Sequence, residues 1–370
     1  MFSGKYGPAK LSLIVNSLCN FLLQNSGNSK ILRILIQTKK FHRATIHLYL
    51  DMKQFCRLTI GSILLLTFSS WGFFAHYRIG RLAVFTLPKA MAGFYKSNIE
   101  YLTEHAISAD KRRYVDSTEA PHHFLNADHY GKDPFKRIPH NWYDAASKYT
   151  ADTLDKYGTV PWTIQYNYYR LVKAFKAHDT TAILNTSANL GHYIADAHVP
   201  LHLTQNYNGQ LTNQTGIHAL WESRLPELYS NRYNYYAGKA RYIENPLTEA
   251  FKICRSSFKS VDTVLRFERI LNKTFPADKK YTMVLHGQKE IKDYSLEYAA
   301  AYHKMLKGMV ERRMRSAILE IGSYWYSAWV DAGQPDLNKL VKQPMGYAER
   351  VKIQKEEALY KSGKVVVLTK

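Results

Sequence analysis

Histidine and acidic residues recur at metal-binding spacing near the middle of the sequence. His192 and Asp196 are four residues apart, so on a helix they share one face. Pro200 predicts that this helix ends at about Val199, and His202 follows where the turning chain can return to the same face. Nitrogen and carboxylate ligands that converge in this way suit zinc. The alternative interpretation is an ion pair on a helix surface, which the apolar surroundings of these residues disfavour.

A second histidine–carboxylate pair follows one loop later. His218 and Glu222 are again four residues apart, and Leu220 and Trp221 between them suit a buried helix face. Alone, such a pair is typical of a solvated helix. Its position directly after the first pair makes it a candidate for a second metal site.

Upstream of these pairs, the residue types allow several further ligands. Asp110 and His123 lie in segments with a loop-like composition. Chemistry alone does not prefer them over four neighbouring side chains, which are Asp116, His122, Asp128 and His129.

The segment before Trp71 has the layout of an export signal. Residues 57–70 contain a short apolar run, which Lys53 and Arg57 precede and Ser69 and Ser70 follow. This run is too short to span a bilayer comfortably, although an uncleaved membrane anchor is the alternative. Phe68 fits the rule of small residues before the cleavage point poorly. We expect cleavage before Trp71 and export to the periplasm, the cell surface or the medium.

Met52 directly precedes this signal and is a candidate start of translation. We therefore predict a signal peptide at residues 52–70 and an upstream extension at residues 1–51, with a basic targeting arm as the alternative. Cleavage would give Trp71 a free amino group beside its backbone carbonyl, and both groups can bind metal. His76 lies one and a half helical turns further and could bind the same ion.

Charge and cysteine content restrict the partners and the means of stabilisation. The 370 residues carry a formal charge of +21, and residues 71–370 hold 42 basic and 29 acidic side chains, a net charge of +13. Such a surface favours anionic partners, including nucleic acid, phospholipid headgroups and membranes. Only Cys254 lies after residue 70, so this part can form no internal disulfide. Packing, or metal bound by histidine and carboxylate, must hold the fold together.

The elements that must position these ligands are helical. Apolar residues recur at helical spacing, with Asp179 as a cap between two helices and a possible break near Gly322. Strand patterns are scarce, and only residues 365–368 look strand-like. We therefore predict an all-α protein with a single helical domain at residues 71–340 and a basic polar tail at residues 341–370. The predicted helices are residues 88–107, 160–178, 180–199 and 294–330.

Taken together, these residues resemble the zinc-dependent phospholipase C and S1/P1 nuclease superfamily. Its motifs match in order: the starting tryptophan, Ala-Asp-x-x-Arg, His-Phe, His-x3-Asp-x5-His and His-x3-Glu. All nine ligand positions of the family are filled, by Trp71, His76, Asp110, His123, His192, Asp196, His202, His218 and Glu222.

The resemblance implies the phospholipase C/P1 nuclease fold and three zinc ions. It assigns the first zinc to Asp110, His123 and His192, the second to His202, His218 and Glu222, and the third to Trp71 and His76. Asp196 would bridge the first and third ions. Asp110 and Asp196 are the expected catalytic residues, with Asp110 orienting or deprotonating the water whose hydroxide attacks phosphorus.

The identity of the phosphate ester is less constrained. Glu222 resembles the phospholipase branch, whereas Trp221 beside it and the Pro-Leu before His202 resemble the nuclease branch. Tyrosines at 166–169 and 233–236 could stack nucleic acid bases, although helix packing is the common role of such residues. We expect an exported phospholipase C-like hydrolase of phosphoric esters.

Two alternatives stay open: an S1/P1-type nuclease on single-stranded nucleic acid, and a non-catalytic, zinc-stabilised binding module at the cell surface. The expected partner is a phosphodiester, either phospholipid or single-stranded nucleic acid. Transient contact with a membrane surface is possible, and the sequence indicates no protein partner.

Overall fold

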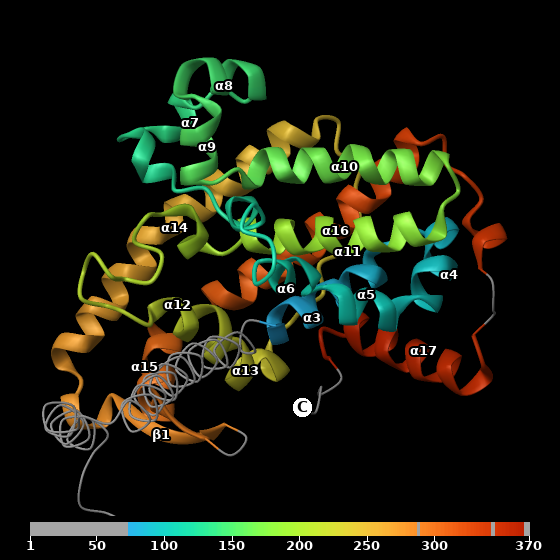
Figure 1. Cartoon of the computed structure of the whole chain (residues 1–370). Coiled ribbons are helices and arrows are strands. Elements are labelled where there is room, and N and C mark those ends of the chain that lie inside the picture. Colours follow the sequence, from blue (N-terminus) through green and yellow to red (C-terminus); the bar gives the residue numbers. More distant parts are fainter. Residues whose placement is uncertain (1–72, 287–288, 342–344, 366–370) are drawn as a thin grey trace, which may run out of the picture. The chain divides into compact units, whose positions relative to one another are not determined.

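Helices form most of the regular structure in the computed structural model, which describes residues 73–286, 289–341 and 345–365 (Figure 1). The all-α prediction is confirmed. The predicted signal peptide, the upstream extension and Trp71 lie outside the described residues.

The described α-helices vary from single turns to a helix of 29 residues. In chain order they are α3 (Phe73–Ala83), α4 (Lys89–Ser97), α5 (Ile99–His105), α6 (Ser108–Arg112), α7 (Pro134–Arg137), α8 (Trp142–Tyr149), α9 (Ala151–Tyr157), α10 (Val160–Lys176), α11 (Thr180–Ala197), α12 (Ile217–Ala219), α13 (Leu225–Tyr229), α14 (Pro246–Thr274), α15 (Leu296–Met305), α16 (Met309–Asp331) and α17 (Tyr347–Lys361). Short 3-10 and π turns connect them, namely η1 (Val84–Thr86), η2 (Ala120–His123), η3 (Ala127–Tyr130), η4 (Pro200–Leu203), η5 (Leu220–Arg224), η6 (Ser230–Arg232), η7 (Ala277–Lys279) and η8 (Leu337–Leu340).

Helix α11 is the central element of the core. It contacts α10, α16, α5 and α3, and α10 runs beside it in Figure 1. Its second half is buried on all sides, as expected of an apolar helix inside a protein. The Asp179 side chain accepts a hydrogen bond from the backbone N–H of Ala182, which confirms the predicted cap between α10 and α11.

Two predicted helices are divided in the structure. The segment 88–107 is split at Asn98 into α4 and α5. The segment 294–330 is split at Gly308, where φ is +73°, whereas α16 continues through Gly322. The prediction of a break near Gly322 was therefore wrong. A Cβ at Gly322 would lie 3.3 Å from the carbonyl oxygen of Ala83, so this glycine permits close packing of α16 against the end of α3.

The described residues contain one small sheet, which the sequence analysis did not predict. Strands β1 (Tyr281–His286) and β2 (Lys289–Tyr294) pair antiparallel, with Tyr281 opposite Tyr294. The buried tyrosine ring of Tyr294 stacks on Tyr298 of α15, which attaches the hairpin to the helices.

The segment that we predicted as a basic polar tail contains helix α17, which packs on the start of the domain. Ile353 and Tyr360 are buried, and Arg81 of α3 donates two hydrogen bonds to Glu356, of 2.6 and 2.8 Å. The helix thus braces α3. Among the described residues, no helix combines the length and apolar character needed to cross a membrane.

Candidate metal centre

The end of α11 places two candidate ligands on one face. His192 Nε2 lies 3.2 Å from Asp196 Oδ2, and both side chains are buried. The helix ends at Ala197, and Pro200 then begins the turn η4, which returns His202 to the same region. The predicted helix end and return are therefore present.

The first group of donor atoms combines Asp110, His123 and His192. They come from α6, η2 and α11, and their donor atoms all lie within 4.8 Å of one another. His123 Nδ1 is 3.1 Å from His192 Nε2 and 3.8 Å from Asp110 Oδ1. Asp196 Oδ2 lies only 2.8 Å from His123 Nδ1, so it adjoins this group.

The second group consists of His202, His218 and Glu222. Glu222 Oε2 is 2.7 Å from His218 Nε2 and 3.3 Å from His202 Nε2. Glu222 lies in the π-helical turn η5, directly after α12, which carries His218. π-Helical turns are rare in proteins, and those that occur often lie at functional sites.

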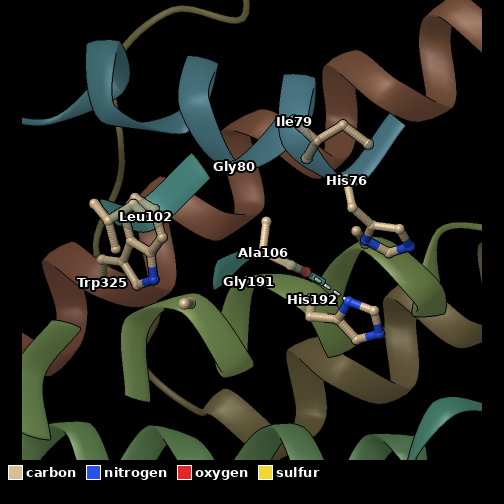
Figure 2. A pocket seen from close by; sticks show the side chains of 10 residues that line it. His76, Ile79, Gly80, Leu102, Ala106, Gly191, His192 and Trp325 are labelled. Carbon is tan, nitrogen blue, oxygen red and sulfur yellow. Dashed lines mark hydrogen bonds between the residues drawn. The ribbon is translucent and has the colours of Figure 1, made fainter. Parts of the chain in front are cut away.

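The third group contains His76, His192 and Asp196, with His76 projecting from α3. His76 Nε2 is 3.3 Å from Asp196 Oδ1 and 3.5 Å from Glu222 Oε1. Figure 2 shows the His76 and His192 rings, which stack with centroids 4.2 Å apart, beside a small pocket that Gly80 and Gly191 also line. Trp71, the other predicted ligand here, lies outside the described residues.

Backbone carbonyls orient three of the histidines. His192 Nδ1 lies 2.8 Å from Ala106 O (Figure 2), and His202 Nδ1 lies 2.7 Å from His123 O. His218 Nδ1 lies 3.2 Å from Tyr207 O. A carbonyl can only accept, so we assign the proton to Nδ1 in each ring, which leaves Nε2 free to bind metal.

Opposing charges face one another within the centre. Burial alone would raise the pKa of Asp196 and Glu222, but the surrounding histidines, above all His202 beside Glu222 and His192 beside Asp196, hold both pKa values well below their usual range. Burial lowers the pKa of His76, but hydrogen bonds that its ring donates to Asp196 and Glu222 outweigh burial and raise the pKa. The centre therefore keeps ionised carboxylates in a buried position, where a cation would compensate them.

The donor set fits zinc. Five imidazoles and three carboxylates converge, and nitrogen with carboxylate oxygen is a donor combination that zinc prefers. Two ring nitrogens of this set, His76 Nδ1 and His123 Nε2, are buried without a hydrogen bond among the described residues. In each ring the other nitrogen faces Asp196. We call the nitrogen on the side away from Asp196 the outer nitrogen.

The other candidates from the sequence have structural partners instead. Asp116 is exposed and caps a turn by accepting from Thr118, so the structure brings Asp110 to the donor group and not Asp116. Asp128 accepts from Thr204 Oγ1 and from the backbone N–H of Gln205.

The histidines beside the predicted ligands also lie outside the three donor groups. His129 stacks on Tyr157, and His122 Nδ1 lies 3.9 Å from Glu119. His198 is buried and hydrogen-bonds to Ile194 O. Burial, with Arg313 nearby, lowers its pKa to about 3, so it is neutral.

The sequence analysis missed one buried carboxylate beside the centre. Glu119 lies four residues before His123, and its Oε1 is 3.4 Å from His123 Nε2. The i,i+4 spacing was visible in the sequence, but the segment lacks helical periodicity, and it is not an α-helix in the structure.

Comparison with known families identifies a match to most of the chain. A family model described as S1/P1 Nuclease matches residues 71–319, a range that begins at Trp71 and includes all nine predicted ligands. A search of curated proteins finds no match to this chain.

Proposed function

Because the chain belongs to the S1/P1 nuclease family, whose members hydrolyse phosphodiesters, we propose that it is an exported, zinc-dependent nuclease for single-stranded nucleic acid. The family match favours this alternative over the phospholipase C-like function that we expected from the sequence. Phospholipid contact gains no support from the comparison.

The observation that carries the proposal is that three donor groups lie side by side, two of which meet at Asp196. A zinc site that only stabilises a fold needs one closed set of four ligands. Here two of the three groups share His192, and Asp196 lies between His76 of one group and His123 of the other. His76 Nε2 is also 3.5 Å from Glu222 Oε1 of the remaining group. Shared carboxylates and open groups support catalytic metals and argue against the binding module.

In this proposal the three groups hold zinc, and Trp71 completes the third group with its free amine. When bound, zinc acts as a Lewis acid, which polarises the phosphoryl group and lowers the pKa of nearby water. Asp110, whose side chain is 21% exposed, orients the attacking water and accepts its proton. Arg113 Nη1 lies 3.7 Å from Asp110 Oδ1 and is 44% exposed, so it can neutralise the charge of the phosphate.

Surface features are compatible with a polyanionic substrate. Residues 71–370 carry a net charge of +13. Of the tyrosines that we considered for base stacking, Tyr168, Tyr233 and Tyr235 are buried and belong to the core, whereas Tyr166, Tyr169 and Tyr236 are exposed. Base stacking on tyrosine is therefore restricted to the exposed members.

The proposal is tested with the chain that starts at Trp71. We expect it to cleave single-stranded DNA or RNA, to lose this activity with a chelator and to regain it with zinc. Phosphatidylcholine is the comparison substrate. Hydrolysis of the lipid but not of nucleic acid would contradict the nuclease, and chelator-resistant activity would contradict the zinc dependence.

Export is tested through the amino terminus. We expect the secreted chain to begin at Trp71 when it is sequenced from that end. A chain that keeps extra residues before Trp71 lacks the free amine and should bind one zinc fewer. Equal zinc content and activity in both forms would refute the role of Trp71.

A further inference from the structure

A buried group of polar side chains lies on the outer side of His123. The inner nitrogen of this ring, Nδ1, is 2.8 Å from Asp196 Oδ2. The outer nitrogen, Nε2, lies 3.4 Å from Oε1 of Glu119, which is itself only 5% exposed. This distance is slightly longer than an ordinary hydrogen bond and within the range of an ion-pair contact.

Two further side chains fix the orientation of Glu119. Arg112 donates from Nε to Oε2 and from Nη2 to Oε1, both at 3.1 Å, which is a two-pronged arginine–carboxylate pair. Tyr193 Oη donates to Oε1 and accepts from Arg112 Nη2 at 3.0 Å. The carboxylate therefore has little freedom to turn away from His123.

This network joins the three segments that supply the first donor group. Arg112 lies in α6 with Asp110. Glu119 directly precedes η2, which ends at His123, and Tyr193 follows His192 in α11. A movement of any one segment would strain hydrogen bonds to the other two. The network thus sets the relative positions of the first group's ligands.

His123 differs from the other histidines in its outer partner. His192, His202 and His218 face backbone carbonyls with their outer nitrogens. His123 faces a carboxylate, which favours the proton on Nε2 and makes Nδ1 a stronger donor to metal. Loss of such a partner typically costs about 10–100-fold in metal affinity.

We propose that Glu119 is a positioning residue that, held by Arg112 and Tyr193, presents Nδ1 of His123 to the first zinc. The inference rests on the proposed function, because it requires that the donor groups bind zinc. Glu119 does not touch the substrate in this scheme, so its effect is on metal binding.

The test replaces Glu119 by Gln in the full chain that starts at Trp71. Zinc affinity is measured by competition with a chelator, and zinc content by elemental analysis after dialysis. We expect one zinc to bind about 10–100-fold more weakly in Glu119→Gln, with the others unchanged. Cobalt substitution adds a spectroscopic readout, since its absorption bands report the altered first site.

Glu356→Gln is the matched control. Glu356 is also a buried carboxylate that accepts two hydrogen bonds from an arginine, Arg81, but it contacts none of the candidate ligands. We expect this variant to be less stable yet to keep wild-type zinc affinity. If Glu119→Gln does not fold, Tyr193→Phe replaces it, with a smaller loss of affinity expected because Arg112 still holds Glu119.

Three results would overturn the inference. Wild-type zinc affinity in Glu119→Gln would contradict the inference directly. The same holds for Tyr193→Phe if that variant is used in its place. An equal loss in Glu356→Gln would mean that general destabilisation is responsible. A wild-type chain that binds no zinc would refute the proposed function itself, and the inference with it.

Discussion

Removal of the central carboxylate should disturb two donor groups at once. Asp196 Oδ1 lies 3.3 Å from His76 Nε2 in the third group, and its Oδ2 lies 2.8 Å from His123 Nδ1 in the first. Glu222, in contrast, belongs to the second group alone. Its Oε2 lies 2.7 Å from His218 Nε2 and 3.3 Å from His202 Nε2, and its Oε1 is 3.5 Å from His76 Nε2. The two residues therefore predict different losses of metal.

The expected magnitudes follow from this sharing of ligands. Asp196→Asn replaces an anionic ligand of two groups by a neutral amide, so zinc content should fall from about three ions per chain to about one. Glu222→Gln weakens one group, so about two ions should remain. Activity on single-stranded nucleic acid should be lost in both, because the reaction needs the complete centre.

Elemental analysis of dialysed protein measures these contents directly. Asp128→Asn is the control, since Asp128 hydrogen-bonds Thr204 and Gln205 near the centre but belongs to no donor group. It should retain the wild-type zinc content. Equal losses in Asp196→Asn and Glu222→Gln, or full zinc content in Asp196→Asn, would refute the inferred sharing.

Two further predictions concern the helices that support the centre. Glu356→Gln leaves the half-exposed Glu100 as the carboxylate that pairs with the buried Arg81. The variant should lower the free energy of unfolding by about 2–4 kcal/mol in urea denaturation, and a loss below about 1 kcal/mol would contradict the bracing role of α17. Gly322→Ala places a Cβ 3.1 Å from Thr86 Cβ. This overpacking should lower the free energy of unfolding by about 1–3 kcal/mol, and with it the melting temperature. An unchanged or higher melting temperature would mean that α16 can move away from Thr86.

The parts of the centre that depend on local sequence could be predicted. His192 and Asp196 are neighbours because of helical spacing, and the cap at Asp179 and the break at Pro200 fix the ends of α11. The same reasoning held for His218 and Glu222, since four-residue spacing survives the π-helical turn between them.

The choice among isolated ligands required tertiary structure. Asp110 and Asp116 are equivalent in chemistry and lie six residues apart. Asp110 lies in α6, which packs against α11 and brings it to His192, whereas Asp116 lies beyond the end of α6 and is exposed. Whether a glycine interrupts a helix was also ambiguous in the sequence. Gly308 has a positive φ and directly precedes the first residue of α16, whereas Gly322 is helical and allows close packing. Sequence alone does not distinguish these two uses.

The metal-free centre should lose stability as the pH rises. Burial lowers the pKa of His202, but Asp196 and Glu222 outweigh it and raise the pKa to about 9, against an ordinary value of 6.5. A raised pKa means that the protonated ring favours the folded state. This contribution is complete below about pH 6.5 and is lost as the pH rises through 9. It amounts to on the order of 3 kcal/mol. Asp196 and Glu222, with lowered pKa values, stay ionised throughout this range.

Zinc occupies the nitrogen that would otherwise carry the proton, so the loaded protein should lack this dependence. Urea denaturation of chelated and zinc-loaded protein between pH 6.5 and 9.5 measures the difference. The chelated His202→Gln variant controls for other titrating groups, because it lacks the ring and should show a flatter profile. If the chelated wild-type protein were as stable at pH 9.5 as at pH 6.5, charge pairing would not hold the empty centre together. If the variant kept the full dependence, His202 would not be its source. Should both expectations hold, protons and zinc alternate as the cations that compensate the same buried carboxylates, and zinc affinity must fall as the pH is lowered.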